Sequence, residues 1–461
     1  MNIMKKLFEP VDMTVGKPWE DILIFTVPML IGNIAQQLYN TVDSVIVGRF
    51  VGDNALAAVG SAGPILNLLI VLFVGISVGA SIMVSQYFGA RSKENLSKTI
   101  GTSIVLTGIA SVIIMVVATL ASRPLLELLD TPETIIDWCT SYLHILFIGV
   151  AGLAYYNILS GILRGLGDSM SALWYLLVAS LLNVVLDLVF VANMDMGVSG
   201  VALATVIAQG VSAALCMRKL TKMRDLFELH KEDFKLSPFH ATNVIKLGVP
   251  SGLTQAIMSM AMLVVQSLTN SFGEMFIAAN VIVMRVDGFA MMPNFSFGTA
   301  MTTYAGQNVG AGEKERVEKG ARQGALMAMG ISAAIVVVIL IFGKYLMGIF
   351  TETQELVDLS MNMMRILSVG YIAVAVTQTL SGVMRGAGDT VTPMWISLIS
   401  TIVIRVPLAY GLVYLTKTPE LPQGQQACIF ISLMISWVMG ALITTICYKR
   451  GKWKTKWEGA K

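Results

Sequence analysis

Apolar runs of about twenty residues, bounded by charged residues, glycine or proline, recur along the whole chain. A helix rises 1.5 Å per residue and needs about 20 apolar residues to cross the hydrocarbon core of a bilayer. The pattern therefore predicts an all-α polytopic membrane protein with twelve transmembrane helices. The predicted spans are 20–47, 55–84, 98–121, 135–161, 170–192, 198–220, 242–270, 276–305, 320–346, 356–382, 391–415 and 426–448.

The composition agrees with this class, because 55% of the 461 residues are hydrophobic and 13% are charged, whereas a soluble domain has about 25% charged residues. The four cysteines show no CxxC spacing, and the three histidines do not cluster with other metal-ligating residue types. These patterns indicate neither a disulfide framework nor a metal centre. We expect a chain that works in a lipid bilayer, without a nucleic-acid partner or a cofactor.

Lysine and arginine are concentrated in alternate connections between the predicted spans. Because cytoplasmic connections carry the excess of positive charge, both termini are expected in the cytoplasm of a multi-pass protein of the cell membrane, plasma or inner. The polar connection near 218–241 separates two sets of six spans. It divides the chain into an N-terminal lobe (1–220), a cytoplasmic linker (221–241) and a C-terminal lobe (242–461).

The two halves of the sequence match one another. "SGILRGLGDS" at 160–169 recurs as "SGVMRGAGDT" at 381–390, an offset of 221 residues, and "QYFGARSKE" from Gln86 finds "QNVGAGEKE" from Gln307 at the same offset. Pro28 finds Pro250 at an offset of 222. Parallel six-helix repeats related by a pseudo-twofold axis along the membrane normal are one layout of secondary transporters.

The repeated RGxGD sequence contains Arg164 and Asp168 in its first copy and Arg385 and Asp389 in its second. It lies between the fourth and fifth spans of each lobe, on the predicted cytoplasmic side. Its glycines permit a tight turn, and its Arg and Asp side chains can bond exposed backbone groups or one another. We expect a structural turn rather than a contact with a transported compound.

Six ionisable side chains lie well inside predicted spans, where a charge is costly and usually functional. They are Asp43, Asp187, Asp287, Arg285, Arg365 and Arg405. Asn183 and Asp187 are four residues apart in "NVVLDLVF" and share one helix face. Helix geometry places Asp187 roughly 25 Å from the cytoplasmic start of its span. Asp43 and Thr205 fall at a compatible depth, so these four residues can meet in one pocket.

Two carboxylates, an amide oxygen and a hydroxyl supply hard oxygen ligands for a small cation. Two like charges that lie close together in a poorly hydrated site cannot both ionise cheaply, so entry of a proton or of Na⁺ would be coupled to the charge of the pocket. The alternative is that Asp187 is a packing residue satisfied by its neighbours. In the second repeat the positions of Asp43, Asn183 and Asp187 are taken by Val265, Ile404 and Leu408.

The C-terminal lobe carries different charges. Asp287 falls close to mid-bilayer in its predicted span, and it can either pair with Arg365 or Arg405 or line the central cavity. Arg285 is two residues from Asp287, and residues at that spacing do not face each other on a helix. The two lobes are therefore expected to share a scaffold but not the acidic pocket.

The sequence resembles the multidrug and toxic compound extrusion (MATE) family. The resemblance extends from "VPMLIGNIAQQLYNTVDSVIVGRFVG" at 27–52 through both copies of the repeated motifs to the last span. The NorM-like branch is known for acidic residues in helices 7 and 10, which are absent here. The positions of Asp43, Asn183, Asp187 and Thr205 match the DinF-like branch, for which the resemblance implies a cation-coupling site.

This resemblance implies a secondary active efflux transporter that exports organic cations or amphipathic drugs and toxins in exchange for H⁺ or Na⁺ by alternating access. We expect a monomer that binds a small cationic or amphipathic compound. It is not expected to be an enzyme, since no nucleophile–base or metal constellation occurs. The alternative is a flippase for a lipid-linked oligosaccharide, which a cationic cavity would favour.

Overall fold

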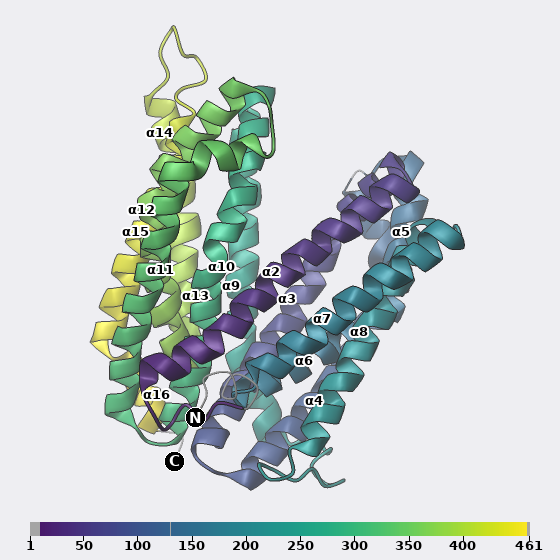
Figure 1. Ribbon diagram of the computed structural model, residues 1–461, viewed down its shortest axis with the longest axis vertical. Helices are drawn as coiled ribbons and strands as arrows, with labels where there is room; N and C mark the ends of the chain where they lie inside the picture. The colour runs from purple at the N-terminus through teal and green to yellow at the C-terminus, as the bar shows by residue number, and fades with distance from the viewer. Residues whose placement is uncertain (1–9, 130, 459–461) are drawn as a thin grey trace. The chain divides into compact units, whose positions relative to one another are not determined.

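The computed structural model describes residues 10–129 and 131–458, and the regular elements in these ranges are helices. Residues 1–9 of the predicted N-terminal lobe lie outside the described ranges. Figure 1 shows the first repeat in purple to teal. Its elements are α2 (Pro18–Phe50), α3 (Asp53–Gly89), α4 (Lys93–Leu128), α5 (Glu133–Ile148), α6 (Val150–Gly165), α7 (Ser169–Asp187), a π-helical turn (Leu188–Asn193) and α8 (Gly197–Lys222).

The second repeat follows a linker that ends before Pro238. Its elements are α9 (Pro238–Asn270), α10 (Glu274–Gly310), α11 (Lys314–Gly348), α12 (Gln354–Gly386), α13 (Val391–Leu398), a π-helical turn (Ile399–Ile404), α14 (Arg405–Leu415), α15 (Ala427–Arg450) and α16 (Lys452–Glu458). The twelve predicted spans are confirmed: eleven helical stretches in the described ranges are long and apolar enough to cross a membrane, and the pair α5 and α6 supplies the twelfth.

The prediction of one continuous helix over 135–161 is wrong. The helix breaks at Gly149, and α5 and α6 are bent by 52° relative to one another. A Cβ atom at Gly149 would collide with the side chain of Val206 on α8. Glycine therefore permits a close approach of α8 at the point where the chain bends.

Two predicted spans contain a π-helical turn, which hydrophobic periodicity does not distinguish from an α-helix. The turn Leu188–Asn193 begins directly after Asp187, and the turn Ile399–Ile404 ends directly before Arg405. The two turns do not occupy equivalent positions of the repeat. Such turns are rare and frequently accompany functional residues, and here each adjoins a charged residue of its span.

The chain packs into two compact units. Within the described ranges, unit 1 takes residues 10–12 together with Val27–Gly252, and unit 2 takes Met13–Thr26 together with residues 253–458. The predicted N-terminal lobe (1–220), linker (221–241) and C-terminal lobe (242–461) describe the repeats of the sequence, and this division stays a prediction. The units differ from those repeats, because each repeat has a short segment near its start that packs with the helices of the other repeat.

In unit 1 the central helix is α6, which packs against α3, α4 and α8. The start of α9 joins this unit, since Val244 is fully buried in the same apolar core as Ile162 of α6. Gly75 of α3 and Gly248 of α9 pack backbone to backbone, because a Cβ at Gly75 would lie 2.9 Å from the Gly248 carbonyl oxygen. Small residues at such crossings let membrane helices approach closely.

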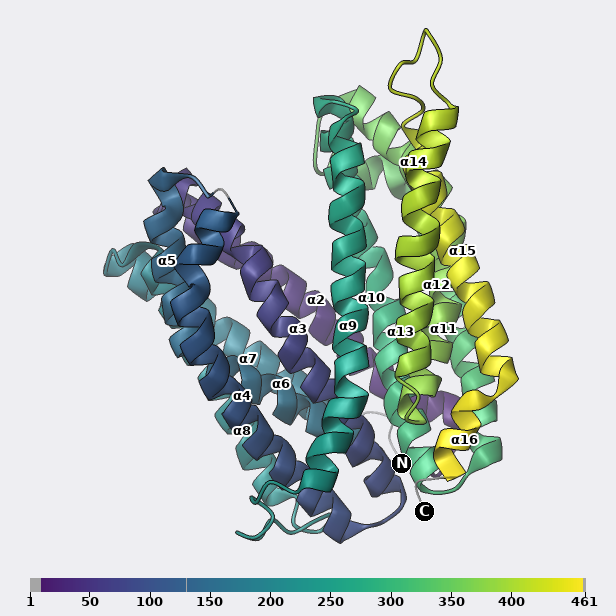
Figure 2. The ribbon, with the colours of Figure 1, turned by 180° about the vertical axis from the view of Figure 1, so that it is seen from behind.

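In unit 2 the central helix is α12, which ends within the second RGxGD sequence and is the repeat counterpart of α6. It packs against α10, α11 and α15, as Figure 2 shows. Tyr371 of α12 is fully buried, and Val265, near the end of α9, is buried in the same core. Thus α9 begins in the core of unit 1 and ends in the core of unit 2.

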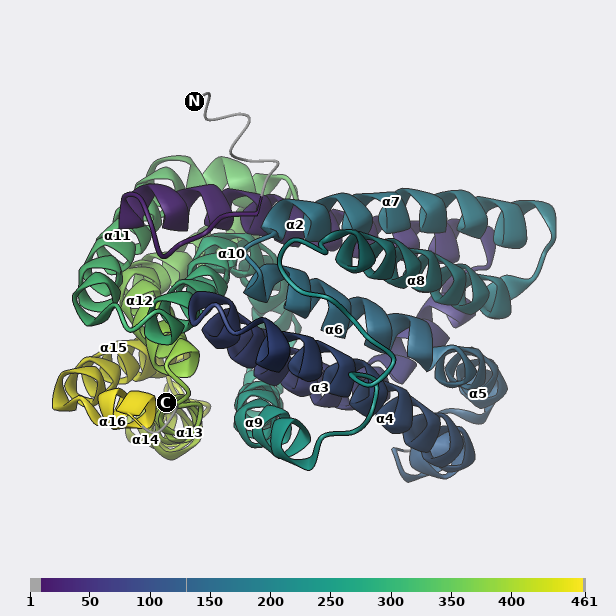
Figure 3. The same cartoon turned by 90° about the horizontal axis from the view of Figure 1, so that it is seen from below.

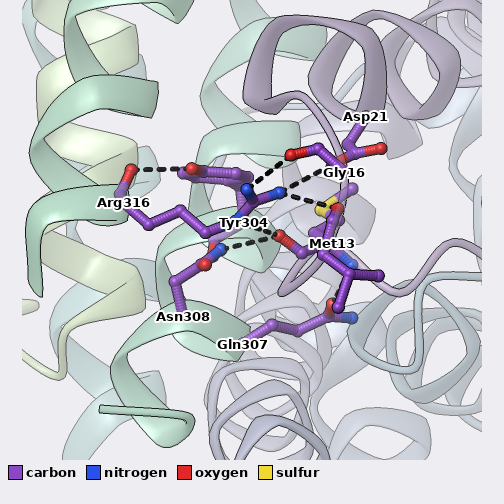
Figure 4. Close-up of polar contacts among 8 residues, drawn as sticks. Met13, Gly16, Asp21, Tyr304, Gln307, Asn308 and Arg316 are labelled. Carbon is purple, nitrogen blue, oxygen red and sulfur yellow. Dashed lines mark hydrogen bonds and ion pairs between the residues drawn. The ribbon is translucent and has the colours of Figure 1, made fainter. Parts of the chain in front are cut away.

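The N-terminal segment Met13–Thr26 is held in unit 2 by Arg316 of α11 (Figure 4). The guanidinium donates to the Met13 carbonyl oxygen at 3.0 Å and to the Val15 and Gly16 oxygens at 2.8 and 2.7 Å. It also forms an ion pair of 2.9 Å with Asp21, and the two side chains are only 15% and 7% exposed. Gln307 and Asn308 of α10 also bond the Met13 backbone, at 2.9 and 3.1 Å, so Arg316 and these two side chains together fix the entry of the chain into α2.

The two RGxGD sequences form the same capped turn. Asp168 accepts hydrogen bonds from the Ser171 backbone N–H at 2.9 Å and from the Ser171 hydroxyl at 2.7 Å. Asp389 accepts the same pair of bonds from Thr392, at 3.1 and 2.7 Å. The glycine before each aspartate has a φ of 89° or 94°, a conformation that favours glycine. Each aspartate is therefore the N-cap of the following helix.

Removal of either cap is expected to destabilise the protein by about 1 kcal/mol, because an unsatisfied N–H remains at the helix start. Thermal unfolding of purified Asp168→Ala and Asp389→Ala should show similar decreases in Tm. Asp389→Asn keeps an acceptor and should lie close to the wild type, as should Asp225→Ala in the exposed linker. Equal stability of the wild type and both Ala variants would refute the capping role.

Candidate functional site

Two acidic side chains meet inside unit 1. Asp43 of α2 and Asp187, the last residue of α7, have carboxyl groups within hydrogen-bonding reach of one another. Asp187 is 0% exposed and Asn183, one turn earlier on α7, is 1% exposed. Thr205 lies on α8, which packs beside α7 (Figure 3). The four residues singled out in the N-terminal lobe are thus brought together by three helices.

The amide of Asn183 connects the acid pair to α8. Its Nδ2 donates to Asp187 Oδ2 at 2.8 Å, and its Oδ1 accepts from the Thr205 backbone N–H at 3.0 Å. Amide oxygen and nitrogen are assigned from their partners, and this orientation satisfies both ends of the amide. The opposite orientation would leave only a bond of 3.3 Å from Nδ2 to the Thr205 hydroxyl.

Tyr39 belongs to the same group and was missed by sequence reasoning. Its hydroxyl forms a hydrogen bond with the side chain of Thr205. The signal was present in the sequence, because Tyr39 precedes Asp43 by four residues and therefore lies on the same face of α2. A phenol inside a span gives no charge signal, however, and tyrosine is common in membrane helices.

The acid pair has unused binding capacity. Asp43 Oδ1 and Asp187 Oδ1 are buried and accept no hydrogen bond from the described residues. A buried carboxylate oxygen without a partner costs about 1–3 kcal/mol or more. The free ligand atoms of the pair are carboxylate oxygens, because Asn183 turns its amide nitrogen, and not the oxygen expected from the sequence, toward Asp187. The described residues include no cluster of three or more His, Cys, Asp or Glu. Such a donor set fits a proton or a hard monovalent cation better than a transition metal.

A different site occurs in unit 2, where helices α9, α10, α12, α13, α14 and α15 surround a cavity of about 400 Å³. Its walls are mostly apolar and contain several methionines and aromatic rings. Among them are Met258, Met262, Met284, Met291, Phe295 and Trp437. Three charged residues line it: Asp287, Arg385 and Arg405. We call this space the unit 2 cavity.

Asp287 is fixed in the wall of the unit 2 cavity by Tyr371. The Tyr371 hydroxyl donates to Asp287 Oδ1 at 2.9 Å. The backbone oxygen of Tyr371 accepts from Asn294 Nδ2 at 3.2 Å, and Asn294 Oδ1 accepts from the Ser332 hydroxyl at 2.8 Å. This chain of hydrogen bonds holds the phenol and, through it, the carboxylate.

Neither arginine considered as a partner for Asp287 forms an ion pair with it within 4.0 Å. Arg405 is close enough for a favourable electrostatic interaction. Arg365 is exposed and donates to Asn362 Oδ1 at 3.2 Å instead. Arg285 is exposed on α10 and does not line the cavity. Asp287 thus lies in the wall of the unit 2 cavity and forms no ion pair with either arginine, and its place in the central cavity stays a prediction.

Comparisons with known proteins agree with the repeat. The sequence model of the MatE family matches residues 28–189 and 250–411. The chain is 29% identical to a probable multidrug resistance protein, YoeA of Bacillus subtilis, over 90% of this chain and 92% of the relative.

Solved structures are similar over nearly the whole chain. One, described as the outward-facing conformation of a multidrug resistance MATE family transporter of the MOP superfamily, has 26% identity and a TM-score of 0.89 and covers 97% of this chain and 98% of its own. Another, from Pyrococcus furiosus, is a MOP superfamily transporter described as having a binding pocket of reverse polarity that suggests a different function. It has 26% identity and a TM-score of 0.88, with 96% of this chain and 97% of its own covered.

Proposed function

The chain belongs to the MatE family of multidrug transporters, and from this membership we propose that it exports organic cations or other amphipathic compounds in exchange for H⁺ or Na⁺. We place it in the DinF-like branch, in the cell membrane, as a monomer with both termini in the cytoplasm. The protein is a multi-pass membrane transporter, and we propose that it uses a coupling ion, H⁺ or Na⁺, and no cofactor.

The observation that carries the proposal is the carboxyl pair of Asp43 and Asp187. Each acid has a buried oxygen without a hydrogen-bond donor, and the second repeat has only apolar side chains at the corresponding positions. A structural acid would need its oxygens satisfied, since a buried unpaired carboxylate is costly. Retention of the pair in one repeat therefore supports a role in binding an ion.

The mechanism follows from the charge of this pair. Two unit charges 4 Å apart repel by about 4 kcal/mol at an effective dielectric constant of 20. Binding of H⁺ or Na⁺ from outside removes that repulsion and permits tighter packing of α2 against α7 and α8. An ion drives transport only if it binds one conformation better than the other. Occupancy of the pair would therefore favour a state with lower affinity for the exported compound.

Proteoliposomes with imposed gradients test the proposal. A pH gradient and a Na⁺ gradient are applied in separate experiments. At least one of them should raise the rate of ethidium transport above the rate without a gradient. A flippase should instead move a lipid-linked oligosaccharide and leave ethidium untouched. The relative described above is named for multidrug resistance, so the flippase is not favoured. Ethidium transport that responds to neither gradient would refute the proposal.

A further inference from the structure

We propose that the unit 2 cavity binds an amphipathic anion, with the acidic group of the ligand against Arg405 and its apolar body against the methionine and aromatic walls. The inference rests on the proposed function only in assuming that the ligand is an exported compound. It adds to the exported compounds a class of amphipathic ligands that carry a carboxylate, sulfonate or phosphate, and it does not require cations such as ethidium to use this cavity.

Arg405 is the residue that most needs a ligand. Its Nε is buried and has no hydrogen-bond acceptor among the described residues. It is the first residue of α14, directly after the π-helical turn, and it lines the cavity. An arginine inside a span normally has an anionic or carbonyl partner. Its planar guanidinium matches the geometry of an oxyanion and can donate two parallel hydrogen bonds to it.

Asp287 does not neutralise the cavity. One of its oxygens already accepts the Tyr371 hydroxyl at 2.9 Å, and no ion pair within 4.0 Å joins it to Arg405 in the described part of the chain. The charged lining consists of two arginines and one aspartate, a net charge of +1. An anion is therefore attracted to this cavity. A cation would be repelled by the two arginines, and the single carboxylate already accepts one hydrogen bond.

The rest of the cavity suits an apolar body. Its volume of about 400 Å³ falls in the range of drug-sized ligand pockets, which are mostly apolar with a few polar groups. Methionine side chains are flexible and polarizable, so they adapt to ligands of different shape. Trp437 lines the same space, and its ring lies 5.7 Å from that of Tyr371. The anchor and the walls thus belong to one site.

The internal repeat supports the choice of charge. Val265, which occupies the repeat position of Asp43, lines the unit 2 cavity. Arg405 follows Ile404, which occupies the repeat position of Asn183. The same region of the duplicated scaffold is therefore acidic in unit 1 and basic in unit 2. Unit 1 offers oxygen ligands to a cation, and unit 2 offers a guanidinium to an anion.

A matched pair of fluorescent probes tests this inference. The sulfonate 8-anilinonaphthalene-1-sulfonate and the uncharged N-phenyl-1-naphthylamine share nearly the same aromatic body. Binding in lipid nanodiscs is followed by energy transfer from Trp437 in a full-length reference protein whose other six tryptophans are replaced by Phe, which serves as the wild type of this experiment, with empty nanodiscs as the background. The wild type should bind the sulfonate at least about tenfold more tightly, which corresponds to one charged hydrogen bond. Trp437→Phe should remove most of the signal and so locate the probe.

Arg405→Gln should remove the preference for the sulfonate and leave binding of the uncharged probe unchanged, which also shows that the variant is folded. Arg405→Lys should retain part of the preference. The matched control is Arg365→Gln, which removes an exposed arginine of the same unit and should behave as the wild type. Equal sulfonate affinity of Arg405→Gln and the wild type would overturn the inference, as would tighter binding of the cationic dye rhodamine 6G.

This experiment separates the inference from the proposed function. Binding is measured without an ion gradient, so sulfonate binding by a protein that shows no gradient-driven efflux would refute only the proposed function. Gradient-driven efflux by a protein that shows no preference for the sulfonate would refute only the inference.

Discussion

Asp187→Asn is expected to abolish gradient-driven efflux while the protein still folds and binds the exported compound. Asparagine keeps the size of the side chain but cannot alternate between a charged and a neutral form. A ligand that does not distinguish two conformations cannot shift their equilibrium, so transport in proteoliposomes should fall to the rate seen without a gradient. Asp43→Asn should give the same loss, and the double variant should lose nothing further, because the two acids act as one unit.

Asp195→Asn is the matched control for this experiment. Asp195 is an exposed acid shortly after the first π-helical turn, and its φ of 52° is a conformation that asparagine tolerates well. The control should transport ethidium as the wild type does. Gel filtration and Tm should be nearly the same for all variants. Full efflux by Asp187→Asn, or an equal loss in the control, would contradict the assigned role of the acid pair.

Arg316→Ala is expected to cause the largest loss of stability, about 3 kcal/mol or more, which for a chain of this size is a decrease in Tm of roughly 3 °C. The substitution leaves Asp21 buried without its ion-pair partner and removes donors from the carbonyl oxygens of Met13, Val15 and Gly16. Thermal unfolding of the purified protein measures the effect.

Two further variants make this test specific. Arg316→Lys keeps the charge, but a compact ammonium group cannot reproduce the fork of donors, so its Tm should be intermediate. Arg322→Ala removes an exposed arginine from the same helix α11 and should change stability by less than about 0.5 kcal/mol. A wild-type Tm for Arg316→Ala would show that the N-terminal segment is held by other contacts.

The sequence predicts most of the helical architecture because membrane helices must satisfy their backbone hydrogen bonds internally, which makes long apolar runs unambiguous. The breaks inside spans are less predictable. At the bend, Gly149 leaves the space of a Cβ to Val206 of α8, and nothing in the local sequence indicates that contact. The two π-helical turns keep the apolar pattern of an α-helix, so they were read as part of continuous spans.

The site residues were found to different extents. The acids were identified because a charge inside a span is expensive, and Asn183 and Thr205 were found by their position relative to those acids. Tyr39 was missed because a tyrosine gives no such signal. Arg405 was identified as a charge inside a span, but the sequence does not show that its Nε has no hydrogen-bond acceptor. Asp287, a possible acceptor, bonds Tyr371 instead, and that contact joins residues 84 positions apart.

The exchange of short segments between the repeats has a consequence for the origin of the chain. At the repeat offset of 222, residues 13–26 correspond to 235–248, which overlap the stretch of α9 that packs in unit 1. A six-helix ancestor made of one repeat would therefore have been a domain-swapped homodimer, in which each copy completed the core of the other. Folding and dimerisation of that ancestor would have been a single event, and gene fusion would have made its assembly independent of protein concentration.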